Sequence, residues 1–158
     1  MPLHHCSVLD VGCGFADFAT FLRERFAGLT YSGIDLCPDM IQEARSSHPE
    51  LDLRVANIVT EGLDRTFDIV TANGIFYLLG DDAWSTMKGI VERMFRTATK
   101  AVAFNSLSIW AANQEAGEFY ADPLQTMEFC RKITPWVVLR HDYHPRDFTV
   151  YLYETPRT

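Results

Sequence analysis

A short apolar run followed by a glycine loop constrains this chain more than any other stretch. Residues 8–14 read VLDVGCG, so an apolar strand is predicted first and Gly12 and Gly14 follow it directly. Glycine in such a loop can adopt unusual backbone dihedrals and lets a ligand approach the main chain closely. A helix is expected to begin at Asp17. The stretch therefore predicts a strand, a ligand-binding loop and a helix.

Strands and helices are expected to alternate through most of the chain. Strands are predicted at 7–11, 31–35, 51–55, 67–72 and 101–106, and helices at 17–26, 38–47, about 82–97 and 123–133. Two further β-rich runs, 136–143 and 148–153, are joined by four residues, which suits an antiparallel hairpin. The expected fold over residues 1–158 is one α/β domain with a Rossmann-like, mainly parallel seven-stranded sheet and helices on both faces. We expect no N-terminal lid helices, because the first strand begins within a few residues of the start.

Composition narrows the class of protein. The 158 residues suffice for one domain with a sizeable core, and no apolar run approaches the ~18–20 residues of a membrane span. The net charge of -7 disfavours nucleic-acid binding through phosphate neutralisation. No secretory signal is visible, and the four cysteines lack metal-ligand spacing. We therefore expect a cytoplasmic protein with reduced thiols, no metal, and neither a membrane nor a nucleic acid as partner.

An acid at the end of the second predicted strand indicates the kind of ligand. Asp35 lies 21 residues after Gly14, where a carboxylate can accept hydrogen bonds from ribose hydroxyls. A dinucleotide-binding loop would need glycine at position 17, but Asp17 stands there. Unless it serves only as a helix cap, this carboxylate repels a pyrophosphate, and Asp10 on the strand adds negative charge. S-adenosylmethionine fits, because it carries a sulfonium, an ammonium and an adenosine but no phosphate. A nicotinamide-dependent oxidoreductase is the least favoured alternative.

The motifs resemble those of class I S-adenosylmethionine-dependent methyltransferases, in particular small bacterial methyltransferase-domain proteins. The matching segments are 8–14, 33–35, 57–58 and 67–74, and in order and spacing they cover almost the whole chain. The resemblance implies S-adenosylmethionine as cofactor, with the glycine loop under its methionine part, Asp35 on the ribose and residues 57–58 beside the adenine. The cofactor-binding residues predicted on this basis are Asp10, Gly12, Cys13, Gly14, Asp17, Asp35, Leu36, Met40, Asn57, Ile58, Asn73 and Gly74.

Three features depart from the family's pattern. The family usually has an acid where Asn57 stands, although an asparagine can still offer an acceptor and a donor to adenine. Ala16 replaces the third loop glycine, a change that we expect the close helix approach to tolerate. The missing lid could come from another protomer, from residues 107–121 or from sequence outside this chain. We therefore expect that the chain can form a homo-oligomer.

Methyl transfer from a sulfonium is an in-line displacement, so the protein must mainly align the reactants and exclude water. The acceptor is expected beyond residues 73–76, which read NGIF. This differs from the Asn/Asp-Pro-Pro-aromatic run of methyltransferases that act on adenine or glutamine amino groups. No cysteine lies between 37 and 130 for a cytosine C5 mechanism. Phe76, Tyr77, Trp110 and Tyr120 are predicted to line the acceptor pocket, with Phe119 as a further aromatic candidate, and Tyr143 and His144 are the candidates for a general base.

Two functions follow from this interpretation. The first is an enzyme that methylates an oxygen or nitrogen atom of a small-molecule acceptor. The alternative is a non-catalytic, methyltransferase-like module that binds S-adenosylmethionine as a subunit of a larger assembly, which the missing lid would explain.

Overall fold

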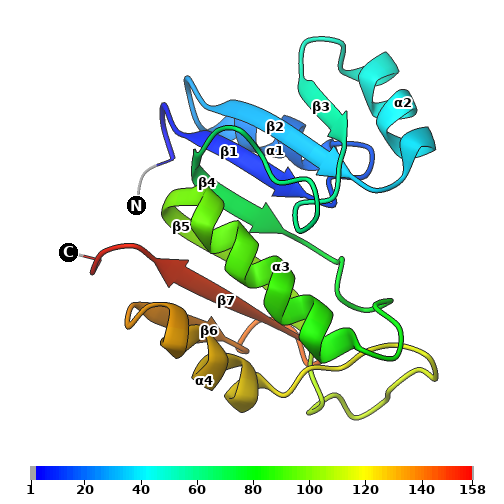
Figure 1. The fold of residues 1–158 in the computed structure, drawn as a ribbon, viewed down its shortest axis with the longest axis vertical. Coiled ribbons are helices and arrows are strands. Elements are labelled where there is room, and N and C mark those ends of the chain that lie inside the picture. The colour runs from blue at the N-terminus through cyan, green and yellow to red at the C-terminus, as the bar shows by residue number, and fades with distance from the viewer. Residues whose placement is uncertain (1–2, 158) are drawn as a thin grey trace.

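Seven strands form one sheet in the order β3-β2-β1-β4-β5-β7-β6 in the computed structural model, which describes residues 3–157 (Figure 1). The strands are β1 (Ser7–Val11), β2 (Thr30–Asp35), β3 (Asp52–Val55), β4 (Phe67–Ala72), β5 (Ala98–Leu107), β6 (Val137–Arg140) and β7 (Asp147–Tyr153). The first five run parallel, whereas β7 pairs antiparallel with both β5 and β6. The predicted seven-stranded, mainly parallel sheet with a C-terminal hairpin is confirmed.

Helices lie on both faces of this sheet, as predicted. They are α1 (Asp17–Arg25), α2 (Pro38–Ser47), α3 (Ala83–Thr97) and α4 (Pro123–Ile133). In Figure 1, α3 and α4 lie in front of the sheet and α1 lies behind it. Proline at the first position of α2 and α4 suits a helix start, because its fixed φ is helical and its missing N–H is not needed there.

Each face of the sheet has its own apolar core. Val8 of β1 packs with Ala19 and Leu22 of α1, whereas its neighbour Leu9 packs with Val91 of α3. Successive residues of a strand point to opposite faces, so β1 is buried on both sides. The same alternation turns Asp10 toward the α1 face, beneath the loop that follows β1.

One half of the α1 face is left open. A groove of ≈ 530 Å³ runs beside α1 over β4, β5 and β7. Leu22 and Phe26 of α1 line one side of it, and Tyr151 and Tyr153 of β7 line the other. No helix within residues 3–157 covers this part of the sheet.

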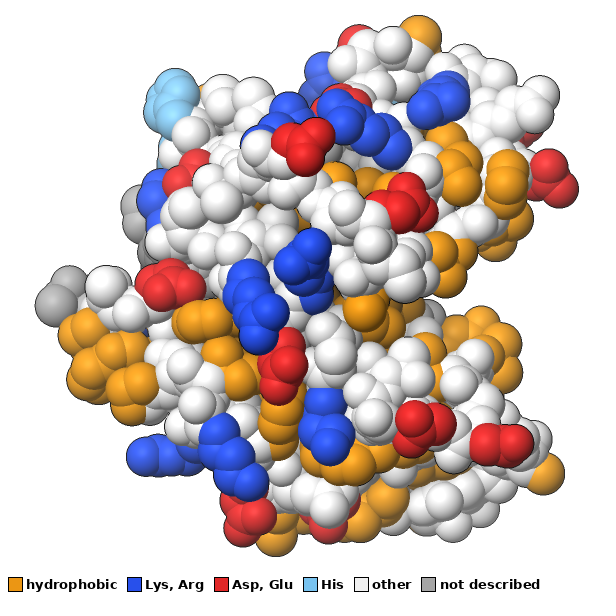
Figure 2. Space-filling view, in the orientation of Figure 1, with side chains coloured by type: hydrophobic (Ala, Val, Ile, Leu, Met, Phe, Trp, Pro, Cys, Tyr) orange, Lys and Arg blue, Asp and Glu red, His pale blue; other side chains and the backbone are white. Residues whose placement is uncertain are grey.

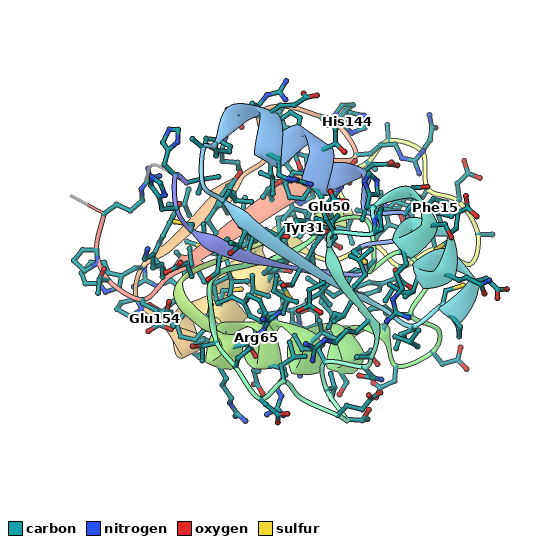
Figure 3. All side chains as sticks on the ribbon, turned by 90° about the horizontal axis from the view of Figure 1, so that it is seen from above. Phe15, Tyr31, Glu50, Arg65, His144 and Glu154 are labelled. Atoms are coloured by element: carbon teal, nitrogen blue, oxygen red, sulfur yellow. The ribbon has the colours of Figure 1, made fainter. Side chains whose placement is uncertain are left out.

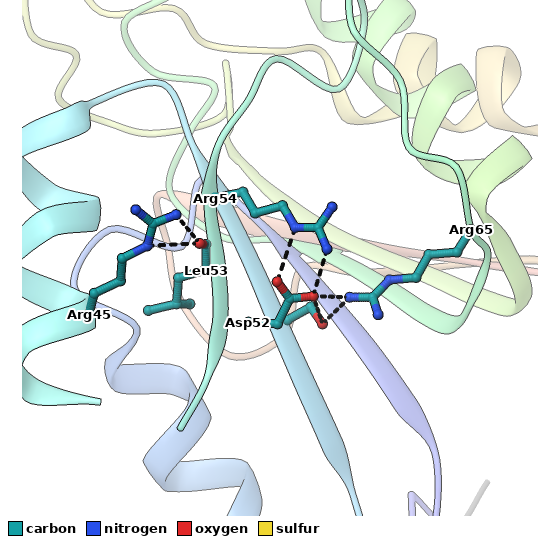
Figure 4. A network of polar contacts seen from close by, with 6 residues as sticks. Arg45, Asp52, Leu53, Arg54 and Arg65 are labelled. Atoms are coloured by element: carbon teal, nitrogen blue, oxygen red, sulfur yellow. Dashed lines mark hydrogen bonds and ion pairs between the residues drawn. The ribbon is translucent and has the colours of Figure 1, made fainter. Parts of the chain in front are cut away.

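The edge strand β3 is fixed by charged side chains on both sides. Arg45 of α2 donates from Nε and Nη2 to the Leu53 carbonyl oxygen at 3.1 and 2.7 Å. Asp52 accepts from Arg54 at 3.0 and 3.3 Å and is also bound by Arg65 (Figure 4). Each exposed ion pair contributes little free energy. Together, however, these contacts join β3 to α2 and to the segment before β4.

The N-cap residue Asp122 is expected to stabilise the start of α4. Asp122 Oδ1 accepts hydrogen bonds from Leu124 N at 2.8 Å and Gln125 N at 3.4 Å. We expect Asp122→Ala to lower the free energy of unfolding by about 1 kcal/mol, measured by urea denaturation. Asp82 is the N-cap residue of α3 and makes no such side-chain bond, so Asp82→Ala is the matched control. Equal losses in the two variants would contradict the cap assignment.

Candidate functional site

The loop between β1 and α1 is anchored on the end of β2. Gly12 N and Cys13 N donate to the Ile34 carbonyl oxygen at 2.8 and 3.0 Å, and Gly14 N donates to Asp35 Oδ2 at 2.9 Å. Gly12 and Gly14 have φ angles of 74° and 53°, in the left-handed region that residues with a Cβ avoid. The two glycines therefore supply the backbone freedom that was predicted for them.

The position of the third loop glycine in the family carries backbone strain. Ala16 is fully buried and has φ 63° and ψ 26°, a left-handed conformation that costs an alanine about 1–2 kcal/mol. Ala16 is also the N-cap residue of α1, and no side chain caps the helix there. Asp17 follows as the first helical residue with an exposed side chain. The Asp17 carboxylate therefore does not cap the helix.

Asp35 holds two loops at once. Its Oδ2 accepts from Gly14 N and its Oδ1 accepts from Cys37 N, each at 2.9 Å. An ionised carboxylate has about four acceptor sites, so both oxygens can accept a further hydrogen bond. Asp35 is only partly buried, which leaves those sites within reach of a ligand.

A cleft of ≈ 480 Å³ opens at the carboxyl edge of the sheet, beside β1 and β2. Its volume suits a ligand of nucleoside size. Five of the residues predicted to bind the cofactor line it together: Gly12, Asp35, Leu36, Asn57 and Ile58. They come from the ends of three successive strands, which the parallel topology brings to one edge.

The opposite wall of the cleft was not predicted from the sequence. It comes from the loop after β4 and from α3, and includes Ile75, Leu79, Asp82, Ser85 and Thr86. No local motif marks these positions, because which side of α3 faces the cleft depends on how its apolar side packs on β4 and β5.

The side-chain oxygen of Asn57 is hydrogen-bonded within the turn that follows β3. Its Oδ1 accepts from Val59 N at 2.9 Å and from Thr60 N at 3.4 Å. Both acceptor sites of the amide oxygen are thereby used, and only the Nδ2 donors remain for a ligand. The acid usual in the family would offer an acceptor instead.

The other predicted cofactor residues do not line this cleft. Asp10 is buried beneath the glycine loop and Cys13 is buried within it, and burial raises the pKa of the Cys13 thiol to about 12. Met40 is partly exposed on α2. Asn73 lines the groove beside α1, and Gly74 N donates to Asn105 Oδ1 at 2.8 Å. Asn105 was not predicted.

The predicted acceptor residues do not share one cavity. Phe76 is buried in the core, where its ring packs edge-on against Phe104 at 5.7 Å between centroids. Tyr77 and Trp110 are exposed. Tyr120 is held by its hydroxyl, which accepts from Arg146 Nη2 at 2.9 Å and donates to Glu118 Oε2 at 2.5 Å. Phe119 is partly buried against the core of the α3 face.

The two general-base candidates lie on the loop between β6 and β7. The Tyr143 hydroxyl is 2.7 Å from Thr149 Oγ1, and burial raises the pKa of Tyr143, which opposes a role as base. His144 Nδ1 lies 3.1 Å from Asp147 Oδ2. Figure 3 shows His144 toward the same end of the molecule as Phe15, in the glycine loop, and away from Glu154. Neither candidate lines the cleft.

Charge on the α3 face is mixed. Figure 2 shows Lys and Arg side chains interspersed with Asp and Glu over this face. Within residues 3–157, no group of three or more His, Cys, Asp or Glu side chains is arranged to hold a metal ion. None of the described helices is long and apolar enough to cross a membrane.

Known proteins share this sequence pattern and fold. Residues 8–117 match a family described as methyltransferase domain. The chain is 27% identical over 151 residues to "Putative methyltransferase Rv1506c" of Mycobacterium tuberculosis, a match that covers 91% of this chain and 90% of that protein. It is 34% identical over 82 residues to trans-aconitate 2-methyltransferase of Escherichia coli, but this match covers 51% of the chain and 32% of the enzyme.

A solved structure agrees in fold. The magnesium protoporphyrin IX methyltransferase of Synechocystis PCC 6803, solved with bound S-adenosylhomocysteine (SAH), has a TM-score of 0.77 at 10% identity. That superposition covers 97% of this chain and 76% of the other. The chain belongs to the methyltransferase domain family, and the predicted class I S-adenosylmethionine-dependent methyltransferase is confirmed.

A substitution at Gly12 tests the close approach in the loop. A Cβ at this position would lie 2.2 Å from Ile75 Cγ2, whereas a Cβ at Gly80, with a nearly equal φ of 73°, would meet nothing within 4 Å. We expect Gly80→Ala to lower the free energy of unfolding by about 1–2 kcal/mol through strain alone, and Gly12→Ala to lower it further. Urea denaturation measures both. Adding Ile75→Ala to Gly12→Ala should recover part of the additional loss of unfolding free energy at Gly12. Additive effects of the two substitutions would contradict the contact between position 12 and Ile75.

Proposed function

We propose that this chain transfers the methyl group of S-adenosylmethionine to an oxygen or nitrogen atom of a small-molecule acceptor. The observation that carries this proposal is the single cleft in which Gly12 and Asp35 meet Leu36, Asn57 and Ile58. Three strand ends contribute to this cleft. The glycine loop contacts Asp35, the acid proposed to bind the ribose, through the hydrogen bond from Gly14 N.

The residues present fit this cofactor. The remaining acceptor sites of Asp35 suit ribose hydroxyls, Leu36 and Ile58 offer apolar surface to the adenine, and Asn57 Nδ2 can donate to a ring nitrogen. Asp10 and Asp17 favour positive charge near the loop and disfavour a pyrophosphate. When bound, the cofactor supplies a methyl group on a positively charged sulfur. In the proposed assignment, Cys13, Gly14, Met40, Asn73 and Gly74 complete the binding residues, and residues 1–158 form one methyltransferase domain.

The end of β4 offers amide groups to the acceptor. Asn73 follows β4, and Asn105 lies close by because Gly74 N donates to its Oδ1. Amide side chains orient an acceptor but do not remove a proton at neutral pH. An acceptor atom that already carries a reactive lone pair at neutral pH, such as a carboxylate oxygen, therefore suits this end of the sheet. The relative named trans-aconitate 2-methyltransferase supports a small-molecule acceptor.

We assign the acceptor site to aromatic residues of the loops near the cleft. In this proposal, Tyr77 and Trp110 border the acceptor from exposed loop positions and Tyr120 borders it from a half-buried one. Phe76 supports the loop from the core, and no general base is assigned. The proposed setting is the cytoplasm, where reducing conditions keep thiols reduced. No disulfide joins cysteines within the described residues.

Replacing the ribose-binding acid tests the cofactor assignment. We expect wild-type protein to bind SAH in calorimetric titration, and Asp35→Ala to lower the affinity at least about 100-fold, because two charge-assisted hydrogen bonds to the ribose would be lost. Asp39→Ala removes the same charge from an exposed position in the first turn of α2 and is the matched control. Equal affinities of the Asp35 variant and the wild type would refute the assignment.

Turnover separates the enzyme from a non-catalytic module. The protein is incubated with S-adenosylmethionine and a panel of small amines, carboxylates and phenols, and SAH formation is recorded. Formation with at least one acceptor, lost in the Asp35→Ala variant, supports the proposed function. Tight cofactor binding without turnover on any acceptor would favour the module.

We also propose that the chain self-associates through the groove beside α1, where partly exposed aromatic side chains of β7 face solvent. Light scattering should then show a dimer whose population rises with protein concentration. Tyr151→Glu places a charge in the groove and should give a monomer. Leu124→Glu introduces the same charge at an exposed apolar position on α4 and should leave the dimer intact. A wild-type monomer at all concentrations would contradict self-association.

A further inference from the structure

The turn that follows β3 is hydrogen-bonded within itself. Asn57 N donates to Glu61 Oε1 and Glu61 N donates to the Asn57 carbonyl oxygen, each at 3.0 Å. The Asn57 side-chain oxygen accepts from Val59 N and Thr60 N, so the amide cannot rotate without losing both bonds. On this wall of the cleft, Asn57 therefore offers a ligand its Nδ2 donors and not an acceptor.

An arginine joins the same turn to the opposite wall of the cleft. Arg93 of α3 donates from Nε to the Ile58 carbonyl oxygen at 3.1 Å. Its Nη2 lies so close to Gly62 that a Cβ at position 62 would be 2.3 Å from it. These two contacts hold α3 against the turn, and so set the separation of the two walls.

One side of α3 faces the cleft, and its polar residues lie at the beginning of the helix. Asp82, Ser85 and Thr86 line the cleft together with Gly89 and Ile90. These positions are spaced three and four residues apart, so they share one face of the helix. The polar groups of this wall are therefore gathered at the N-cap and in the first turn of α3.

The Asp82 carboxylate faces the cleft without a partner in the fold. Asp82 makes no side-chain hydrogen bond as the N-cap residue of α3, and none of the ion pairs within residues 3–157 includes it. An ionised carboxylate only accepts hydrogen bonds, whereas the Ser85 and Thr86 hydroxyls can both donate and accept them. On this wall, Asp82 is therefore the group that can distinguish a donor from an acceptor on a ligand.

We propose that Asp82 is a specificity-determining residue that accepts a hydrogen bond from the exocyclic amino group of the adenine. This inference rests on the proposed function, which puts the ribose on Asp35 and the adenine beside the turn after β3. Adenine presents an amino donor next to a ring-nitrogen acceptor. Asn57 Nδ2 donates to the ring nitrogen from one wall, and Asp82 accepts from the amino group on the other.

The experiment compares two ligands that differ only in the exocyclic amino group. SAH and its analogue with hydrogen in place of that amino group are titrated calorimetrically at neutral pH. For wild-type protein, we expect SAH to bind about tenfold more tightly, because the analogue lacks one hydrogen bond to a charged group. Asp82→Ala should weaken SAH binding by about the same factor and leave binding of the analogue nearly unchanged. The preference for SAH should thus disappear.

A second substitution tests the division of roles between the two walls. Asn57→Asp keeps one side-chain oxygen for Val59 N and Thr60 N and replaces Nδ2 by an oxygen that can accept from the amino group. In the Asp82→Ala background, Asn57→Asp should restore a preference for SAH over the analogue of about tenfold. A purely structural role of Asp82 would leave the ratio of the two affinities unchanged in every variant.

Asp81→Ala is the matched control. Asp81 is an exposed carboxylate next to Asp82, but it does not line the cleft. Its removal changes the charge of the protein equally and should leave the ratio of the two affinities at the wild-type value. Because Asp82 makes no cap bond, both alanine variants should keep the wild-type unfolding temperature, which thermal unfolding measures.

The outcomes distinguish this inference from the proposed function. If wild-type protein binds neither ligand, the cofactor assignment fails. If it binds both equally well, or if Asp82→Ala keeps the wild-type preference, the cofactor assignment stands and the role of Asp82 is refuted. An equal loss of preference in Asp81→Ala would assign the effect to net charge and would likewise refute a direct bond from the amino group to Asp82.

Discussion

The Asp35 carboxylate joins two loops that the sheet alone would leave independent. It accepts from Gly14 N in the loop after β1 and from Cys37 N in the loop after β2. These bonds fix the N-terminal ends of α1 and α2 relative to each other, and thereby one wall of the cleft. Because the carboxylate is oriented before any ligand arrives, little ordering is needed on binding. The same group thus stabilises both loops, and in the proposed function its remaining lone pairs accept hydrogen bonds from a ribose.

Negative charge around the glycine loop selects among ligands that share a nucleoside. A helix N-terminus with free N–H groups attracts phosphates. In the loop before α1, however, the Gly12, Cys13 and Gly14 N–H groups already donate to Ile34 and Asp35. Asp17 begins that helix, Asp10 lies beneath the loop and Asp35 beside it, so the local field opposes a phosphate. Asp82 adds a further carboxylate on the opposite wall of the cleft. The backbone geometry therefore favours a nucleoside ligand, and the side chains favour one with positive charge.

Local signals account for what the sequence predicted well. Pro38 and the Asp122-Pro123 pair mark helix starts through fixed φ and capping, and β1 and β4 are apolar runs because they are buried on both faces. Predictions that depended on packing were less successful. Phe76 has the composition of a pocket residue, yet it lies in the core against Phe104. Likewise, the cleft-facing side of α3 follows from tertiary contacts that no local pattern encodes.

The proposed cofactor site and the proposed acceptor site are formed by different kinds of structure. This explains why the cofactor site could be predicted from the sequence and the acceptor site could not. The former uses strand ends and main-chain geometry, whose motifs are short and ordered. In the proposed function, the acceptor side uses the segment 107–121 and the loop between β6 and β7. These two segments are joined by a hydrogen bond from Ser108 N to the Arg146 carbonyl oxygen at 2.8 Å and by the contact of Arg146 with Glu118. These charged groups satisfy each other and leave little net charge for recognition. Under the proposed function, selectivity for an acceptor comes mainly from shape, from exposed aromatic surface and from neutral amides such as Asn73. These features vary freely in loops on a common fold.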